Sequence, residues 1–468
     1  MHPVLLTTDL LFFLLLATAL LYGLYAYRHE HLRAPWRQVA RQPLGMAAAM
    51  VLAAYLLVAV LDSVHFRVTL PAGEHSGASY SGDVTSVFDL LVTPLRDSIE
   101  RTYSAPFAAE AYAKEMVELA DGSTARTYPR LEHGGAHLRD PASERGADIA
   151  ARLISGILLG AALAVAVGAA VVTLCARSAR QPVVVVATRM LRGKGNVPWR
   201  VILGTVLLLA LLFGCGIEIA PYYHVFGTDQ VGNDVLYQAL KSIRTGLLIG
   251  TLTTLVMLPF AVVLGLAAGY FGGWVDDVIQ YLYTTLSSIP GVLLVAASAL
   301  MLEVYMAHHG ARYATLAARA DLRLLALCLI LGVTAWTGLC RYLRGEALKL
   351  RAVDFIEAAR ALGVSHTTIL MRHIVPNIMH IVMISIVLDF SGLVLAEAVL
   401  TYIDIGVDPS MESWGNMING ARLELAREPV VWWSLCAAFA FMFGLVLAAN
   451  IFADTVRDAF DPRLRDAE

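Results

Sequence analysis

Charged residues are scarce in this chain. Only 16% of its 468 residues are charged, 58% are hydrophobic, and the mean hydropathy is +0.65. A composition this poor in charge excludes an ordinary soluble domain, which needs a polar surface. It predicts an all-α polytopic membrane protein, because a helix of about 20 residues crosses the hydrocarbon layer with its backbone groups paired internally.

Several chemical motifs are also missing. The chain has no phosphate-binding loop of the form G-x-x-x-x-G-K-[ST], since Gly193-Lys194-Gly195 lacks the spacing and the hydroxyl. The five cysteines have no metal-like spacing, and no nucleophile constellation appears. His133 and His137 are separated like helical metal ligands, but two glycines intervene. We therefore expect no catalytic, cofactor-binding or metal-binding residue in this chain, and no enzymatic activity of its own.

Nine apolar runs are long enough to span a bilayer. The first is expected to be a retained anchor, because no basic segment precedes it and no cleavage site follows. A net charge of -3 argues against nucleic acid as a partner. The expected spans are residues 4–27, 44–61, 150–174, 201–219, 245–270, 278–302, 322–343, 378–400 and 430–453.

Basic residues in the connecting loops predict the orientation, since cytoplasmic loops retain arginine and lysine. The loops at 28–41, 177–200 and 341–372 hold most of them, whereas 220–244, 302–321 and 401–429 hold two each. An odd number of spans then places the N-terminus outside and the C-terminus in the cytoplasm. The turn at 271–277 departs from this rule, because it has two aspartates and no basic residue.

One basic loop carries the most informative pattern. Glu357-Ala358-Ala359 is followed by Gly363 and then by Ile374-Val375-Pro376. The residue types predict a helix over 354–362, a left-handed stop at Gly363, and a second short helix that Ser365 caps and that ends before Pro376. An ordinary cytoplasmic connection is the alternative interpretation.

This spacing resembles the EAA loop of ABC importer permeases. Every position of that family's motif is filled in this chain. Further segments in the same order are similar to the C-type permease subunits of dipeptide and oligopeptide importers. Val225, Asn233 and Asp404 depart from that pattern and leave the substrate open. The similar segments are 224–235, 244–247, 269–277, 288–291 and 413–417.

The resemblance implies a fold and a domain organisation. Residues 201–468 would form a type I, MetI-like permease core of six helices, with the EAA loop at 345–376. Residues 1–200 would add three helices and a periplasmic insert at 62–148. Fourteen acidic and eight basic residues occupy this insert. We expect a Gly/Ser-rich strip at 72–82 and helices over 85–103 and 107–119; whether the insert docks a solute-binding protein or braces the extra helices stays open.

The resemblance also implies a function in the bacterial inner membrane. The chain would be half of the translocation pathway of an ATP-driven peptide importer, together with a second permease, two ATPases that bind Mg-ATP, a periplasmic solute-binding protein and membrane lipid. Dipeptides, oligopeptides, modified or antimicrobial peptides and nickel chelates remain possible solutes. The residues expected to couple to the ATPases are Glu357, Ala358, Ala359, Gly363, Ile374 and Pro376, with charge contacts from Arg351, Arg360 and Arg372.

Acidic residues near the outer side are candidates for the pathway or its gate. An unpaired carboxylate in a span costs at least ~2.5 kcal/mol, so Asp389 should face a partner or a wet path. The stretch 226–240 is expected to form a helix along the outer interface that gates the path or caps the bundle. The candidates are Asp229, Asp234, Asp389, Asp404 and Trp414; a cationic solute would follow if Asp389, Asp404, Asp408 and Glu412 lined one cavity.

Two other functional classes stay open from the sequence. An ion-coupled secondary transporter would need an internal repeat and coupling acids near the midplane, and Asp389 is one such acid. A membrane scaffold or sensor without transport would account for the long insert but not for the similar segments.

Overall fold

The computed structural model describes residues 2–68, 84–118, 124–193, 195–309 and 315–460, and the structural statements below refer to these residues. Among them, nine helices are long and apolar enough to cross a membrane, which confirms an all-α polytopic protein. The nine are Thr7–Arg28, Pro43–Asp62, Pro141–Ala179, Trp199–Ile219, Val235–Phe271, Gly291–His308, Leu316–Arg351, Ile381–Tyr402 and Trp433–Phe460.

The chain divides into two compact units that interleave along the sequence. The first comprises residues 1–3, 37–245 and 412–448, and the second comprises 4–36, 246–411 and 449–468. Helices α9 (Val235–Phe271) and α17 (Trp433–Phe460) contribute residues to both. The expected boundary at residue 200 stays a prediction.

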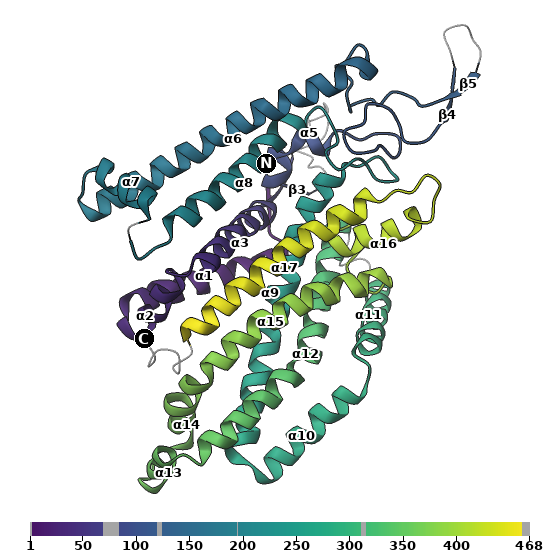
Figure 1. Cartoon of the computed structure of the whole chain (residues 1–468). Helices are drawn as coiled ribbons and strands as arrows, with labels where there is room; N and C mark the ends of the chain where they lie inside the picture. The colour runs from purple at the N-terminus through teal and green to yellow at the C-terminus, as the bar shows by residue number, and fades with distance from the viewer. Residues whose placement is uncertain (1, 69–83, 119–123, 194, 310–314, 461–468) are drawn as a thin grey trace, which may run out of the picture. The chain divides into compact units, whose positions relative to one another are not determined.

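Close packing of two helices dominates the first unit. Helix α6 (Pro141–Ala179) runs beside α8 (Trp199–Ile219), as Figure 1 shows, and α3 (Pro43–Asp62) also packs on α8. A Cβ atom on Gly214 would lie 2.5 Å from the carbonyl oxygen of Gly156 and 2.6 Å from the backbone nitrogen of Gly160. Small residues four apart let the backbones touch, which is how helices associate in lipid without a hydrophobic drive.

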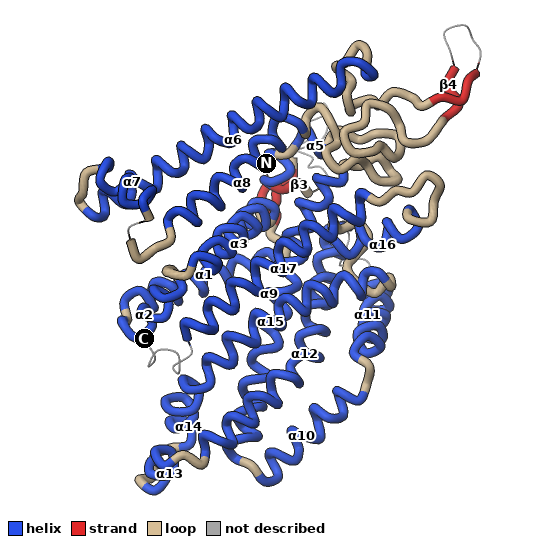
Figure 2. The backbone as a smooth tube through the Cα atoms, in the orientation of Figure 1, coloured by secondary structure: helices blue, strands red, loops and turns tan. Residues whose placement is uncertain are grey.

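Strands occur only as short pieces in the first unit (Figure 2). One sheet has the order β1-β2-β3, with β1 at His2–Val4, β2 at His65–Arg67 and β3 at Thr85–Ser86. Strand β2 pairs antiparallel with β3, with His65 opposite Ser86. Strands β4 (Glu115–Glu118) and β5 (Thr124–Thr127) form a separate antiparallel hairpin.

The insert has far less helix than its sequence predicts. The helix expected over 85–103 is reduced to α4 (Val87–Leu91) and α5 (Thr93–Arg96), and the one expected over 107–119 is wrong. Ser86 caps α4 by accepting the Asp89 N–H at 3.0 Å, so α4 starts at Val87 and not at the predicted Thr85. A new short helix then begins at Thr93, with Pro94 in its first turn. Beyond it, long-range backbone bonds replace helical ones, such as Tyr112 N–H to the Tyr103 carbonyl at 3.0 Å. The predicted strip at 72–82 lies outside the described residues.

The second unit is a bundle of long helices. Helix α12 (Leu316–Arg351) is at its centre. Three helices pack on α12, namely α10 (Gly273–Ser288), α11 (Gly291–His308) and α15 (Val375–Tyr402). Helix α1 (Thr7–Arg28) also packs on α12, where the Asp321 carboxylate accepts the Thr7 N–H at 2.8 Å. The first extra helix is thereby fastened to the core by its N-terminal end.

Two of the expected helices are placed differently in the structure. The run 278–302 is not one helix, because α10 ends at Ser288 and α11 begins at Gly291. Pro290 holds Ile289 in an extended conformation, with φ -87° and ψ 127°. The outer helix expected over 226–240 is also wrong: residues 226–234 form a loop, and Val235 starts α9, which continues to Phe271.

Candidate functional site

The loop with the Glu-Ala-Ala pattern folds as its sequence predicts at its centre. Helix α13 spans Asp354–Ala361, and Gly363 has φ +75°. The Gly363 N–H donates to the Arg360 carbonyl at 2.9 Å, and the Val364 N–H donates to the Ala359 carbonyl at 3.1 Å. These bonds satisfy carbonyls that the helix end leaves free, and the left-handed conformation favours glycine.

A row of isoleucines anchors this loop in the second unit. Ile356, Ile369, Ile374 and Ile378 are all fully buried, in a cluster with Leu343 of α12. The expected coupling residue Ile374 is therefore a buried anchor and not part of the exposed surface. Because every member is fully covered, movement of the loop must displace the ends of the membrane helices beside it.

The opposite face of the loop is exposed and apolar. Leu362 is 83% exposed and Met371 is 72% exposed, and Glu357, Ala358 and Gly363 are exposed as well. Ala359 is half-buried. Large apolar side chains on an extramembrane loop mark a protein-binding surface, particularly beside small residues that permit close approach. We call Glu357, Ala358, Leu362, Gly363 and Met371 the coupling surface.

Arginines expected to contact an ATPase make contacts within the chain. Arg351 donates to the Tyr270 carbonyl at 3.3 Å, at the C-terminal end of α9. The Arg360 guanidinium lies 5.1 Å from the centre of the Tyr270 ring. Among the described residues, Arg372 is the one of the three that is exposed and contacts no other side chain or carbonyl through its guanidinium. Arg351 and Arg360 thus position α13 against α9.

Two further contacts fix the loop to the turn between α9 and α10. The Tyr270 hydroxyl lies 2.8 Å from Nδ1 of His366, and Arg344 donates to Asp276 through two nitrogens at 2.5 and 2.7 Å. These hydrogen bonds from Arg344 lower the pKa of Asp276. Arg344 of α12 thereby supplies the positive charge that the turn at 271–277 lacks in its own sequence.

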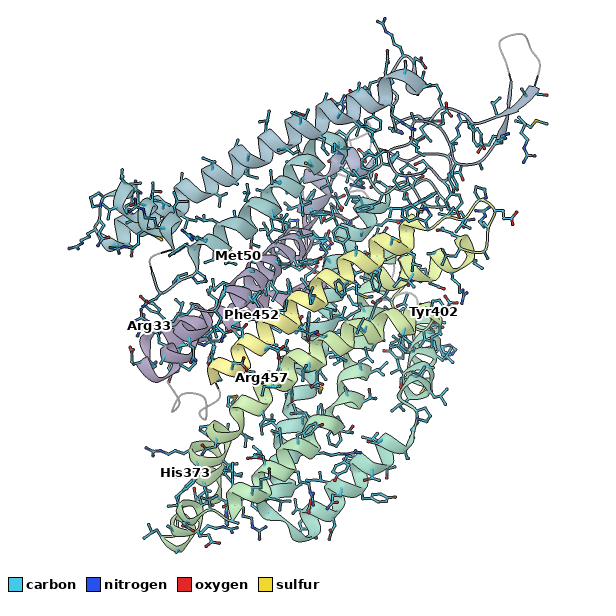
Figure 3. The ribbon with its side chains drawn as sticks, in the orientation of Figure 1. Arg33, Met50, His373, Tyr402, Phe452 and Arg457 are labelled. Carbon is cyan, nitrogen blue, oxygen red and sulfur yellow. The ribbon has the colours of Figure 1, made fainter. Side chains whose placement is uncertain are left out.

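The segment after Gly363 departs from its prediction. Ser365 caps α14 (His366–Ile369) by accepting the Thr368 N–H at 3.4 Å, as expected. The helix does not end before Pro376, however, but continues through a π-helical segment, Leu370–Ile374, into α15. Pro376 lies in the first turn of α15, directly after the π-helical segment. Figure 3 shows His373 of this segment at the opposite end of α15 from Tyr402.

The expected gate residue Asp229 organises a turn. Its carboxylate accepts the N–H groups of Val231 at 2.9 Å and Asn233 at 2.8 Å, and the Gln238 amide at 2.7 Å. These bonds use both oxygens, so the geometry supports the structural alternative.

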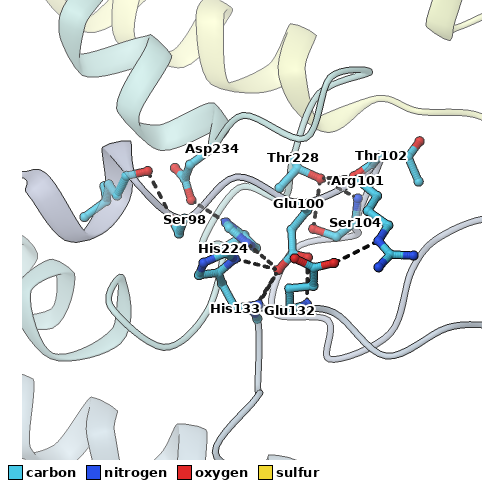
Figure 4. Close-up of polar contacts among 12 residues, drawn as sticks. Ser98, Glu100, Arg101, Thr102, Ser104, Glu132, His133, His224, Thr228 and Asp234 are labelled. Atoms are coloured by element: carbon cyan, nitrogen blue, oxygen red, sulfur yellow. Dashed lines mark hydrogen bonds and ion pairs between the residues drawn. The ribbon is translucent and has the colours of Figure 1, made fainter.

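Asp234 belongs to a buried polar cluster, drawn in Figure 4. Nδ1 of His224 lies 2.7 Å from Asp234, and Nε2 of the same ring lies 3.3 Å from Glu100. Glu100 also accepts the backbone N–H groups of Glu132, His133 and Gly134 at 2.8 to 2.9 Å. Both carboxylates and the imidazole are at most 2% exposed. This outer cluster joins the insert to the segment that precedes α9.

Hydrogen bonding decides the charge state of the outer cluster. Burial opposes ionisation of His224, but its hydrogen bonds to Asp234 and Glu100 raise the pKa to about 9. Burial likewise opposes ionisation of Glu100, but His224 and the three N–H groups lower the pKa of Glu100 to about 2. The histidine is therefore a cation between two carboxylates at neutral pH. Glu100 had no local signal in the sequence, because its partner His224 is 124 residues away.

The remaining gate candidates, Trp414, Asp389 and Asp404, differ in their burial and surroundings. Trp414 is 1% exposed and its indole N–H donates to the Ala239 carbonyl at 3.1 Å, so it is a packing residue of the first unit. Asp389 is half-buried within α15, whereas Asp404 is exposed with φ +62° beyond the end of that helix. From Asp389 to the end of α15 at Tyr402 the helix rises about 20 Å, so Asp404 is displaced from Asp389 along the helix axis. That Asp389, Asp404, Asp408 and Glu412 line one cavity stays a prediction.

The two insert histidines have carboxylate neighbours. His137 Nε2 lies 2.8 Å from Asp148, and His133 Nδ1 lies 3.9 Å from Glu100. Neither residue is in a helix. Within the described part of the chain, no three His, Cys, Asp or Glu side chains are arranged to hold a metal ion.

Comparison with known proteins identifies the family. Residues 261–466 match the model described as the binding-protein-dependent transport system inner membrane component. The chain is 31% identical over 242 residues to the glutathione transport system permease protein GsiD of Pectobacterium atrosepticum, an alignment that covers 52% of this chain and 73% of that protein. The chain belongs to this family of transport-system membrane components.

Other relatives give similar alignments. Identity to the dipeptide transport system permease protein DppC of Lactococcus lactis is 30% over 240 residues, or 51% of this chain and 64% of that protein. Identity to the oligopeptide transport system permease protein OppC of Haemophilus influenzae is 29% over 243 residues, with coverage of 52% and 71%. A solved structure of the MetNI methionine ABC transporter aligns with a TM-score of 0.33 at 16% identity, over 47% of this chain and 94% of that one. The family assignment confirms the resemblance and does not favour a secondary transporter.

Proposed function

We propose that this chain is a transmembrane permease subunit of an ATP-driven importer of peptides or small peptide derivatives. The coupling surface carries the proposal. It presents exposed Leu362 and Met371, while Ile356 and Ile374 on its reverse side are fully buried among the membrane helices. Relatives named as dipeptide, oligopeptide and glutathione permeases support the substrate class.

The mechanism follows from how the loop is attached. A partner that pushes on Leu362 moves α13, and the buried isoleucines pass this movement to α12 and α15. Arg351, Arg360 and His366 pass it to the end of α9 through Tyr270. Because packed elements move as units, displacement of the loop changes the tilt of these helices and switches access between the two sides of the membrane.

The proposed partners are two ATPase subunits, a second permease and an external solute-binding protein. The chain itself is non-catalytic, and Mg-ATP is bound by the ATPases, whose force the coupling surface receives. The nine spans and the basic loops support a periplasmic N-terminus and a cytoplasmic C-terminus in the inner membrane.

Site-specific photocross-linking tests this function. A benzophenone amino acid replaces Leu362 in the whole complex, and the same probe replaces Tyr402 at the opposite end of α15 as a matched control (Figure 3). We expect a nucleotide hydrolase to be captured from position 362 and not from position 402. Capture of lipid alone at position 362, or equal capture at both positions, contradicts the proposal.

Asp389 is proposed to face the solute pathway, because it lies half-buried in a membrane span among apolar residues. Uptake of basic and acidic dipeptides by Asp389→Asn tests this role. A selective loss of basic peptides supports direct electrostatic contact with the solute. An equal loss of both rejects a preference for cations.

A further inference from the structure

Helix α7 (Val183–Arg192) lies in the first unit between α6 and α8, at the end of α6 (Figure 1). One side of α7 is fixed to these helices, because Val186 and Met190 are 7% and 4% exposed. They pack on Ala176 and Trp199. These two residues are four apart and therefore share one face of the helix. The helix is held as a rigid platform.

A second side of α7 is apolar and exposed. Val184 and Leu191, seven residues apart, are 73% and 65% exposed. Leu174, in the last turns of α6, is 64% exposed. Only 6% of the apolar membrane-spanning segment of α6 is buried within the chain, so most of its surface is open to lipid in a membrane. Val184 and Leu191 therefore continue a lipid-facing surface onto α7.

A third side is basic. Arg189 and Arg192 are exposed and, with Val185 and Thr188, line a shallow depression of about 190 Å³. Arg200 is drawn to the same end of the helix, where its Nε donates to the Leu191 carbonyl at 2.8 Å. Helical spacing places each of Val185 and Thr188 one turn before an arginine, so that the depression has a cationic rim and a floor made of one valine and one threonine.

No carboxylate neutralises this side from nearby in the chain. The sequence has no Asp or Glu from 149 to 217, whereas the connection after α6 contributes Arg177, Arg180, Arg189, Arg192 and Arg200. None of these arginines forms an ion pair with a described residue. A compact group of uncompensated cations beside a lipid-facing apolar edge is complementary to a headgroup that carries negative charge and to the acyl chains below it.

We propose that α7 is a binding site for anionic phospholipid, with the headgroup phosphate between Arg189 and Arg192 and the acyl chains along Val184 and Leu191. The arginines of the connection between α6 and α8 place it on the cytoplasmic side by the positive-inside rule, so the site would face the cytoplasmic leaflet. The positive-inside rule accounts for basic residues on this side of the membrane. It does not require that one helix combine a buried face, an exposed apolar face and a basic face.

Fluorescence quenching in lipid nanodiscs tests the site. The full-length chain carries a fluorophore on Thr188→Cys, in a background whose native Cys175, Cys215 and Cys436 are replaced by serine. Spin-labelled headgroups are supplied on phosphatidylglycerol or on phosphatidylcholine. We expect phosphatidylglycerol to quench roughly tenfold more effectively at equal mole fraction, and the double variant Arg189→Gln/Arg192→Gln to reduce this preference to near unity.

The matched control changes two exposed arginines near the other end of α6, Arg139→Gln/Arg145→Gln, and should keep the preference. Equal quenching by both lipids in the parent protein, or a preference that survives the α7 double variant, overturns the proposal. Relief of quenching by millimolar glycerol 1-phosphate would identify a soluble phosphate ligand instead. Protection of the fluorophore from both lipid and aqueous quenchers would identify a protein as the occupant, and either result rejects lipid.

Discussion

Glu100 and His224 show how single residues attach the insert to the first unit. The folded state lowers the pKa of Glu100 from 4.5 to about 2, and raises the pKa of His224 from 6.5 to about 9. The stabilisation from Glu100 is present above pH 4.5 and is lost as pH falls towards 2. The stabilisation from His224 is present below pH 6.5 and is lost as pH rises through 9.

The outer cluster should therefore contribute most to the thermal stability of the purified protein between about pH 4.5 and 6.5. Each shift corresponds to about 3 kcal/mol. In His224→Gln the alkaline decline should flatten, while the part of the acid decline that comes from the three N–H groups on Glu100 should remain. An alkaline slope that is the same in this variant and in the parent protein would show that His224 does not hold the insert through its charge.

Glycine positions give a second residue-scale prediction, in α6. A Cβ atom at Gly160 would lie 2.6 Å from the Ala210 carbonyl oxygen, whereas one at Gly168 would lie 3.7 Å from the Leu203 side chain. Gly160→Leu should force α6 and α8 apart and destabilise the protein by about 1–3 kcal/mol. Gly168→Leu is the matched control and should stay near the parent value. The melting temperature in detergent separates the two outcomes, and equal melting of the two variants argues against backbone contact.

At the scale of elements, α13 and its glycine stop form a unit that the sequence predicts well. Gly363 has φ +75° and open space around its Cβ position, so any cost of substitution comes from the backbone alone. We expect Gly363→Val to cost about 1–2 kcal/mol locally and to uncouple ATP hydrolysis from uptake. Gly363→Asn should retain coupling, because asparagine tolerates this conformation. Uptake and ATPase rates in proteoliposomes measure both, and normal coupling in Gly363→Val contradicts a role for the stop.

Helices and their ends were predictable where neighbouring residues determine them. They were not predictable where contacts between distant segments determine them. The end of α13, the Ser365 cap and the apolar spans all follow from neighbouring residues. The break at Pro290 was also readable locally, but the continuous apolar run concealed it. The insert defied prediction because its acceptors and donors, such as Glu100 and His224, come from segments far apart in the chain. Likewise, no sequence rule shows that Arg351 and Arg360 are occupied by Tyr270.

At the scale of the whole molecule, the first 200 residues are structurally inseparable from the rest. Helix α8 has its closest partner in α6, and α12 is packed by α1 through Asp321. Lys241 of α9 lies 2.5 Å from Asp89 and 3.9 Å from Asp62, both at most 3% exposed. Thus α8, α9 and α12 depend on groups that the first 200 residues supply.

A fragment of residues 199–468 should therefore accumulate poorly in the membrane, and coexpression of residues 1–198 should restore it. The physical reason is the loss of partner surfaces for α8 and α12 in lipid. Immunoblots of membranes and their resistance to protease measure the amount of folded fragment. Accumulation of the fragment alone at the level of the intact chain would show that the extension is an independent addition.

The π-helical segment Leu370–Ile374 holds one more residue per turn than the helices on either side. Deleting a single amino acid there would let the turn relax into regular α geometry without a chain break. The stretch before it would then rotate by roughly 100° about the axis of α15. Ile369 would leave the buried cluster in which it packs, and the segment from α13 to Ile369 would present a different face. One additional amino acid therefore sets the azimuth of this segment about α15.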